Sequence, residues 1–189
     1  TRWSDALLRL TTQTAMLRIE TEVEAPAWEE AGLAWDQLAA GAVHAAVRAT
    51  PFAMLDQWPD IIIEVSLRFV DDETIRELNR DYRGKDSATN VLSFPMAEPE
   101  ELQDQRILGK EFLLGDIVIA HETTQAEAEA QDKLLAAHVT HLIVHGTLHL
   151  LGYDHEIDEE ADAMESLERS ILASLGLPDP YANGPIGHD

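Results

Sequence analysis

The sequence contains no cysteine at any of its 189 positions. Disulfide-stapled scaffolds and thiolate metal sites are therefore excluded, and any transition metal must be held by histidine or carboxylate side chains. No apolar run reaches the roughly 18–20 residues that a membrane-spanning helix needs, so we expect no membrane partner. Both absences fit a cytoplasmic protein.

Positive charge is also scarce. The chain has 13 Lys and Arg against 36 Asp and Glu, which gives a formal net charge of −23. This balance argues against a general nucleic-acid binder, because such proteins usually carry a basic face. The composition and length fit one globular domain, which we expect to span residues 17–181. Residues 1–16 are then an N-terminal extension rather than a signal peptide, and residues 182–189 a frayed tail.

Hydrophobic periodicity predicts about four strands and about five helices. The strands are expected over 17–23, 61–70, 90–94 and 113–120, and the helices over 31–50, 73–81, 122–130, 134–151 and 158–175. The acidic and polar stretch 97–110 is expected to be a mobile loop. This order of elements predicts an α+β fold with a mixed sheet packed against the helices.

Histidines cluster in the stretch HLIVHGTLHLLGYDH. His145 and His149 are four residues apart on the most apolar helix, so their side chains lie one turn apart on one face and can chelate one ion. A catalytic zinc site usually has a third protein ligand. His141 lies about 12 Å along the helix axis from His149, whereas Gly152 can end the helix in the left-handed conformation and return His155 toward the metal. The sequence thus predicts one Zn²⁺ held on this helix and the turn after it.

The spacing H-x3-H-x2-G-x2-H equals that of the metzincin zinc peptidases, with one departure. Those enzymes carry a general-base Glu directly after the first His, and here Gly146 stands at that position. A peptidase hypothesis therefore lacks its proton shuttle. His138 and His141 are expected to pack, or to hydrogen-bond behind the ligands.

Three blocks of the sequence resemble the YbeY family of bacterial endoribonucleases. They are LNRDYRGKDSATNVLSFP over 78–95, LLGDIVIA over 113–120 and HGTLHLLGYDH over 145–155, in the family's order. The resemblance implies a zinc-dependent, single-strand-specific endoribonuclease that matures the 3′ end of small-subunit ribosomal RNA and acts in ribosome quality control. It also implies the small ribosomal subunit or its proteins as partners.

The same resemblance implies roles for particular residues. His145, His149 and His155 would be the zinc ligands, and Arg83 would correspond to the family's functional arginine. A guanidinium suits that role because it offers paired donors to a phosphate and stabilises charge that develops there. Lys85 and Arg68 are weaker candidates for substrate contacts, and with Arg83 and the zinc ion they would form a local positive channel in an acidic shell.

Two alternatives to a nuclease stay open at this point. The protein could be a metzincin-like zinc peptidase without the Glu base, or a non-enzymatic ribosome-assembly factor whose zinc is structural. If it is a nuclease, the nucleophile is either water or the ribose 2′-hydroxyl, and only the latter leaves a 2′,3′-cyclic phosphate.

Overall fold

The computed structural model describes residues 16–53, 62–98, 101, 111–155 and 157–182. This part of the chain forms four strands and six helices, which confirms the α+β class. Apart from Met16, the predicted N-terminal extension lies outside the described residues, as do most of the predicted loop at 97–110 and residues 183–189 of the tail. None of the helices in the described ranges is both long and apolar enough to cross a membrane.

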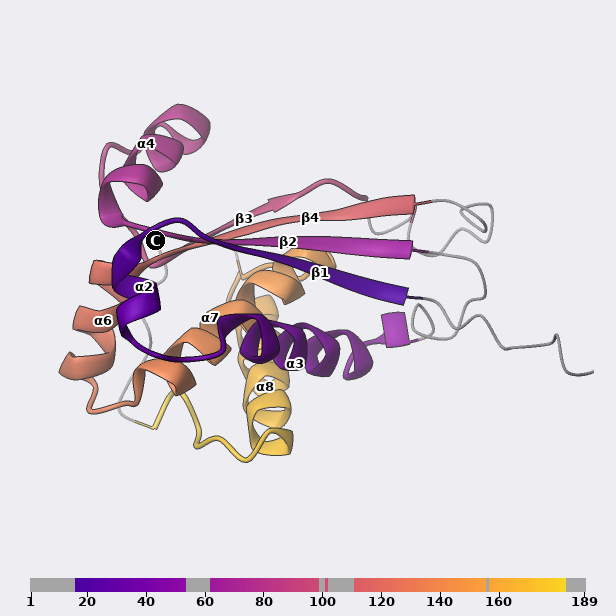
Figure 1. Cartoon of the computed structure of the whole chain (residues 1–189). Coiled ribbons are helices and arrows are strands. Elements are labelled where there is room, and N and C mark those ends of the chain that lie inside the picture. The colour runs from indigo at the N-terminus through magenta and orange to yellow at the C-terminus, as the bar shows by residue number, and fades with distance from the viewer. Residues whose placement is uncertain (1–15, 54–61, 99–100, 102–110, 156, 183–189) are drawn as a thin grey trace, which may run out of the picture.

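The four strands form one mixed sheet in the order β1-β2-β4-β3 (Figure 1). The parallel strands are β1 (Met16–Val23), β2 (Ile62–Val70) and β4 (Glu111–Ala120). β3 (Val91–Pro95) pairs antiparallel with β4 and lies at one edge. The mixed sheet is therefore as predicted, and its β3 edge borders the candidate site.

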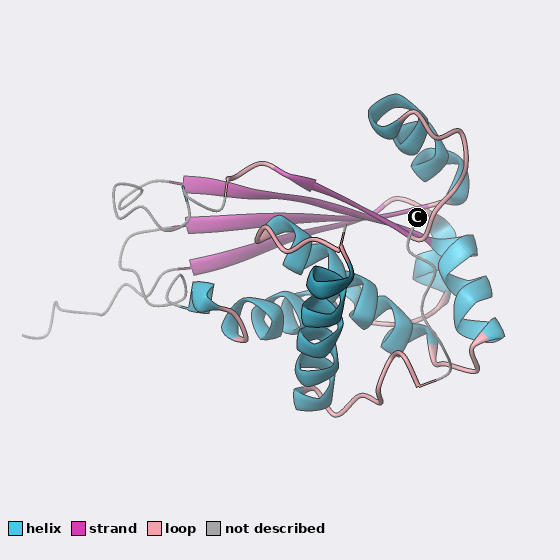
Figure 2. Cartoon of the chain, turned by 180° about the vertical axis from the view of Figure 1, so that it is seen from behind, coloured by secondary structure: helices cyan, strands magenta, loops and turns pink. Residues whose placement is uncertain are grey.

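The two faces of the sheet carry different helices (Figures 1 and 2). On one side lie α3 (Trp35–Arg48), α7 (Leu135–Leu150) and α8 (Asp158–Ser174), and on the other lies α4 (Asp72–Arg83). The main core fills the first side, and six of the 12 buried residues of α7 belong to it. α7 is thus the central helix, as its apolar sequence indicates.

Two local features differ from the prediction. The helix expected over 31–50 begins only at Trp35, because Gly32 adopts a positive φ of 67° and the chain turns there. A short helix, α2 (Pro26–Glu30), was not predicted, since five residues carry too little periodicity. It is held by Trp28, which is fully buried and donates its indole N–H to the carbonyl of Val70 at 2.8 Å.

Helix α4 is longer than its predicted range of 73–81, and its end matters for the site. Asp71 caps its start, since the carboxylate accepts a hydrogen bond from the backbone N–H of Thr74 at 2.8 Å. Gly84 ends it in the left-handed conformation with φ 71°. Arg83 is therefore the last residue of a capped helix rather than part of a loose turn. Helix α6 (His121–Ala130) follows β4 directly.

Candidate metal centre and its pocket

Helix α7 brings His145 and His149 together, as their spacing predicts. Their Nε2 atoms lie 3.0 Å apart. Two nitrogen ligands of one tetrahedral zinc ion, each about 2.0–2.1 Å from the metal, are separated by about 3.3 Å. The two imidazoles therefore already stand at the distance of two ligands on one ion.

In each of the two rings, the hydrogen bond made by Nδ1 determines which nitrogen carries the proton and whether Nε2 presents a lone pair. Nδ1 of His149 lies 2.8 Å from the carbonyl oxygen of Tyr153, which can only accept, so this nitrogen donates its proton. Nδ1 of His145 lies 2.7 Å from the carboxylate of Glu168 and donates in the same way. In the neutral rings both Nε2 atoms then present lone pairs to each other. A shared cation satisfies that arrangement, so the residues present fit a metal ion.

His155 completes a group of three. Gly152 follows the C-terminus of α7 with φ 89°, and the chain turns back there, with the Tyr153 N–H bonded to the carbonyl of Leu148 at 3.0 Å. One ligand atom of each of His145, His149 and His155 lies within 4.8 Å of the others. The turn is held by Asp154, whose carboxylate accepts a hydrogen bond from the backbone N–H of His155 at 2.7 Å.

The electrostatics of His149 favour the metal-binding form of its ring. Burial, and next the neighbouring His145 and His155, lower the pKa of His149 to about 4. The imidazole is therefore neutral near pH 7, and a neutral imidazole is the form that binds a metal.

Glu168 lies behind the ligands and was not predicted from the sequence. It belongs to α8, is fully buried, and hydrogen-bonds to both His145 and His141 at 2.7 and 2.9 Å. A signal was available, because Glu168 interrupts the buried stripe that Met164, Ile171 and Leu172 form on this helix. His141 is thus one layer behind the ligands.

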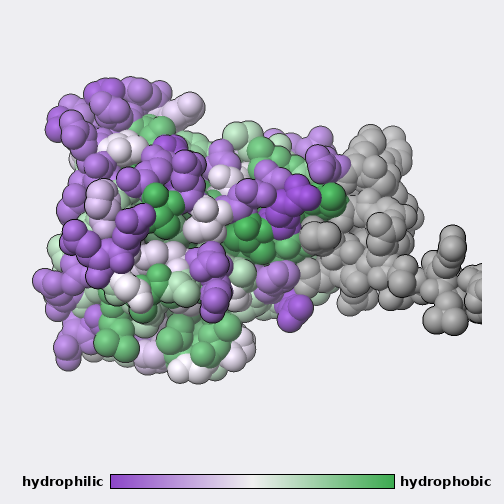
Figure 3. All heavy atoms as spheres, viewed as in Figure 1, coloured by the Kyte–Doolittle hydropathy of each residue, from purple (hydrophilic) through white to green (hydrophobic). Residues whose placement is uncertain are grey.

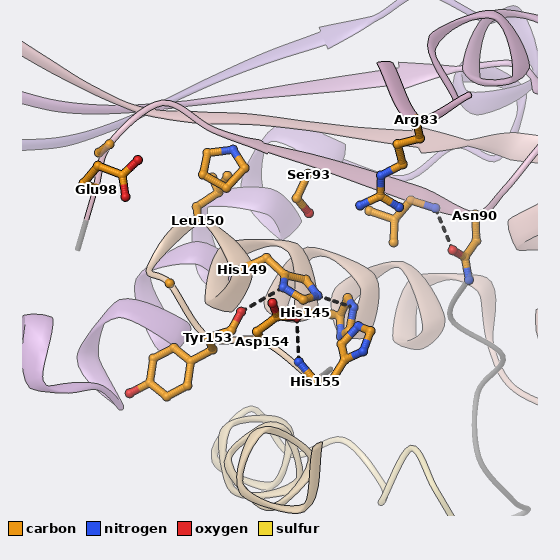
Figure 4. A pocket seen from close by; sticks show the side chains of 14 residues that line it. Arg83, Asn90, Ser93, Glu98, His145, His149, Leu150, Tyr153, Asp154 and His155 are labelled. Carbon is orange, nitrogen blue, oxygen red and sulfur yellow. Dashed lines mark hydrogen bonds between the residues drawn. The ribbon is translucent and has the colours of Figure 1, made fainter. Parts of the chain in front are cut away.

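A pocket of about 630 Å³ opens in front of the histidines (Figure 4). One side is α7 with the turn after it, which we call the histidine wall and which carries His145, His149 and His155. The opposite side is the end of α4 with β3, which we call the arginine wall and which carries Arg83 and Ser93. The remaining described lining residues are Asn90, Val91, Pro95, Ala97, Glu98, Leu150, Gly152, Tyr153 and Asp154.

The arginine wall differs in its exposure and in how it is held. Arg83 is exposed and extends from the end of α4 into the pocket (Figure 4), and hydrophilic residues cover the α4 end of the molecule (Figure 3). Asn90 is buried and was not predicted. It accepts a hydrogen bond from the backbone N–H of Val91 at 2.7 Å and donates to Glu127 of α6 at 2.9 Å.

The other two predicted cations lie elsewhere. Neither Lys85 nor Arg68 is among the described residues that line the pocket. Lys85 is exposed. Arg68 lies on the α4 face of the sheet, where its guanidinium makes two bonds of 2.6 and 3.0 Å to Glu24. The structure therefore brings Arg83 alone of the three arginine and lysine candidates to the triad.

Gly146 lies where helix α7 packs closely against the sheet. A Cβ atom at this position would lie 3.1 Å from Oγ of Ser93 and 3.1 Å from a methyl carbon of Ile117. Those contacts are tighter than an ordinary van der Waals distance. Strands β3 and β4 thus occupy the space in which a general-base Glu after the first histidine would begin.

Comparison with known proteins identifies the family of this chain. The family model described as "Endoribonuclease YbeY" matches residues 33–176. Proteins named Endoribonuclease YbeY from Sphingopyxis alaskensis and Rhizorhabdus wittichii are each 52% identical to this chain, and the matches cover 89% and 87% of this chain and 99% and 97% of theirs. One from Agrobacterium fabrum is 50% identical, over 89% of this chain and 96% of its own. The chain therefore belongs to the YbeY family.

Proposed function

We propose that this protein is a zinc-dependent endoribonuclease that cleaves phosphodiester bonds in single-stranded RNA. The observation that carries the proposal is one pocket in which a three-histidine metal site faces an arginine. Membership of a family whose curated members are named endoribonuclease supports RNA as the substrate. Zinc is the metal proposed because three imidazoles suit it and no redox motif accompanies them.

The residues of the two walls divide the work. His145, His149 and His155 hold the ion, which when bound supplies a Lewis acid and lowers the pKa of coordinated water. Arg83 contacts the phosphate from the opposite wall and stabilises the charge that develops on its oxygens during attack. We propose that the pocket of about 630 Å³ between the walls takes a nucleotide of a single strand.

The negative net charge of the chain affects how it would reach its RNA substrate. With a net charge of −23 the chain gains little from long-range attraction to RNA. We therefore propose that a ribosomal particle, through the small subunit or its proteins, brings the enzyme to its site on ribosomal RNA. Maturation of the small-subunit 3′ end and ribosome quality control, in the cytoplasm, are the roles that fit such recruitment.

The peptidase alternative has less support. Gly146 has no carboxylate at the position that carries the general base in metzincins, and a Cβ there would press on side-chain atoms of Ser93 and Ile117. The alternative of a structural zinc is disfavoured by three histidines that face an open pocket, because structural sites are usually closed by four ligands.

The test uses one RNA sequence in single-stranded and duplex form. Zinc-loaded wild-type protein, metal-stripped protein and the His149→Ala variant are purified identically and compared. We expect cleavage of the single strand by the loaded wild type, and a loss of at least about 100-fold after stripping or in His149→Ala, because two ligands cannot hold the ion in place. Equal cleavage by the variant would overturn the proposal. Hydrolysis of casein by the same zinc-loaded wild-type sample would favour the peptidase instead.

A further inference from the structure

The carboxylate of Glu168 is the most deeply buried charged group described in the structure. Its residue is 0% exposed, and His145, His141 and Tyr181 surround it behind the pocket. One oxygen, Oε1, accepts from Nδ1 of His145 at 2.7 Å. The other, Oε2, accepts from Nε2 of His141 at 2.9 Å and from the hydroxyl of Tyr181. Both oxygens are therefore engaged, which fixes the plane of the carboxylate.

An ionised carboxylate in the core is costly unless several donors compensate it. Burial alone raises the pKa of Glu168, but hydrogen bonds from His141 and His145 outweigh burial and hold the pKa well below its ordinary value. Tyr181 closes the cluster from the C-terminal segment, where Arg169 lies over its ring at 4.7 Å. With His145, His141 and Tyr181 around its two oxygens, the carboxylate is placed as a hydrogen-bond acceptor.

We propose that Glu168 is a positioning residue that holds His145 in the tautomer protonated on Nδ1, so that its Nε2 lone pair faces the metal. An unrestrained imidazole prefers the other tautomer, with the proton on Nε2, which would block the ligand atom. His149 obtains the same tautomer from the carbonyl of Tyr153. His145 lies in the middle of α7, where the neighbouring carbonyls already accept the hydrogen bonds of the helix. A side chain from α8 therefore accepts the Nδ1 hydrogen bond of His145 instead.

His141 and Tyr181 hold the carboxylate rather than the ligand. His141 lies one turn before His145 on α7, and its bond to Oε2 leaves Oε1 for His145. Tyr181 covers the same oxygen from the other side. The inference rests on the proposed metal site, but the tautomer it assigns exists with or without the metal.

The decisive variants are Glu168→Gln and a matched control, Glu127→Gln. Glu127 makes the same kind of contact to a buried histidine of α7, His138, with 2.8 Å between Nε2 and the carboxylate, but His138 is not a ligand. Zinc affinity is measured by competition with a chromophoric chelator. We expect Glu168→Gln to bind zinc about 10–100-fold more weakly and Glu127→Gln to bind as the wild type does.

A second readout separates this inference from the proposed function. Long-range ¹H–¹⁵N spectra of metal-free wild type should show His145 protonated on Nδ1, and Glu168→Gln should shift it toward the Nε2 tautomer. If the wild-type protein binds no zinc, the proposed metal site is wrong. The spectra would still decide whether Glu168 sets the tautomer of His145. If Glu168→Gln fails to fold, an Nε2-protonated His145 in the metal-free wild type overturns the inference. Unchanged affinity and an unchanged tautomer in a folded Glu168→Gln do the same.

Discussion

The two walls of the pocket differ in their burial and in how their side chains are held. The histidine wall is a helix in the centre of the core, and the outer nitrogens of its two helical ligands are held by Glu168 and by a backbone carbonyl. The arginine wall is an exposed helix end beside an edge strand, and its Arg83 extends into the pocket from the far face of the sheet. Precise geometry is needed where a metal is bound, whereas a mobile phosphate chain is better met by a long, exposed cation.

The largest effect expected from this comparison is that of Arg83→Ala. Loss of the guanidinium should lower kcat for RNA cleavage by about 10²–10³-fold, the usual cost of one donor to a developing charge. Zinc affinity should stay within about twofold of the wild type, since Arg83 belongs to the opposite wall. Steady-state cleavage and chelator competition measure the two quantities. A parallel loss of zinc would show that the walls are not independent.

Arg68→Ala is the matched control for that variant. It removes the same side chain from the α4 face of the sheet, where Arg68 is bonded to Glu24 outside the pocket. We expect its kcat to change less than about threefold, because an exposed ion pair contributes little. A defect as large as that of Arg83→Ala would instead support the channel hypothesis from the sequence.

Gly115 of β4 lies between β3 and α7, and Gly115→Ala should destabilise the fold. Gly115 has φ 152°, and a Cβ there would lie 2.4 Å from the carbonyl oxygen of Phe94 in β3 and 2.7 Å from Leu150 of α7. We expect the free energy of unfolding in urea to fall by about 2–4 kcal/mol, from overpacking and strained backbone together. Gly41→Ala in α3, where a Cβ meets nothing within 4 Å, should instead gain roughly 0.5–1 kcal/mol.

A further effect concerns the acid stability of the histidine wall. The pKa of His149 falls from 6.5 in the unfolded chain to about 4 in the fold. The unfolded state therefore takes up a proton first, so the metal-free protein should lose stability as the pH drops from about 6.5 to about 4. The loss from this group is at most about 3 kcal/mol. Urea unfolding across that range should show a shallower pH dependence for His149→Gln than for the wild type, and identical slopes would contradict the assignment.

Local sequence patterns were enough to predict that three histidines cluster. A repeat of four on an apolar helix, followed by a helix-ending glycine, specifies His145, His149 and His155 through backbone geometry that depends on near neighbours only. The same holds for most strands and for the existence of helix α4. Helix α2 was not predicted because its stability comes from the contact of Trp28 with the distant Val70 and not from a pattern within its five residues.

Long-range partners could not be predicted in the same way. Nothing near Glu168 in the sequence indicates that α8 crosses behind α7, so its bond to His145, 23 residues away, emerges only when the helices pack. Asn90 and Glu127 meet over 37 residues for the same reason. For Arg68 and Lys85, charge alone suggested a role, and side-chain direction in the fold placed them outside the pocket.

By itself, then, the sequence determined the histidine cluster, the class of fold and the family, because these depend on spacing along one helix and on contiguous blocks. The tertiary structure decided which residues hydrogen-bond to the histidines from behind, which cation faces them across the pocket, and how closely the sheet packs against Gly146. Those properties depend on how α8 and the sheet meet α7, and side chains far apart in the chain become neighbours only through the burial of the common core.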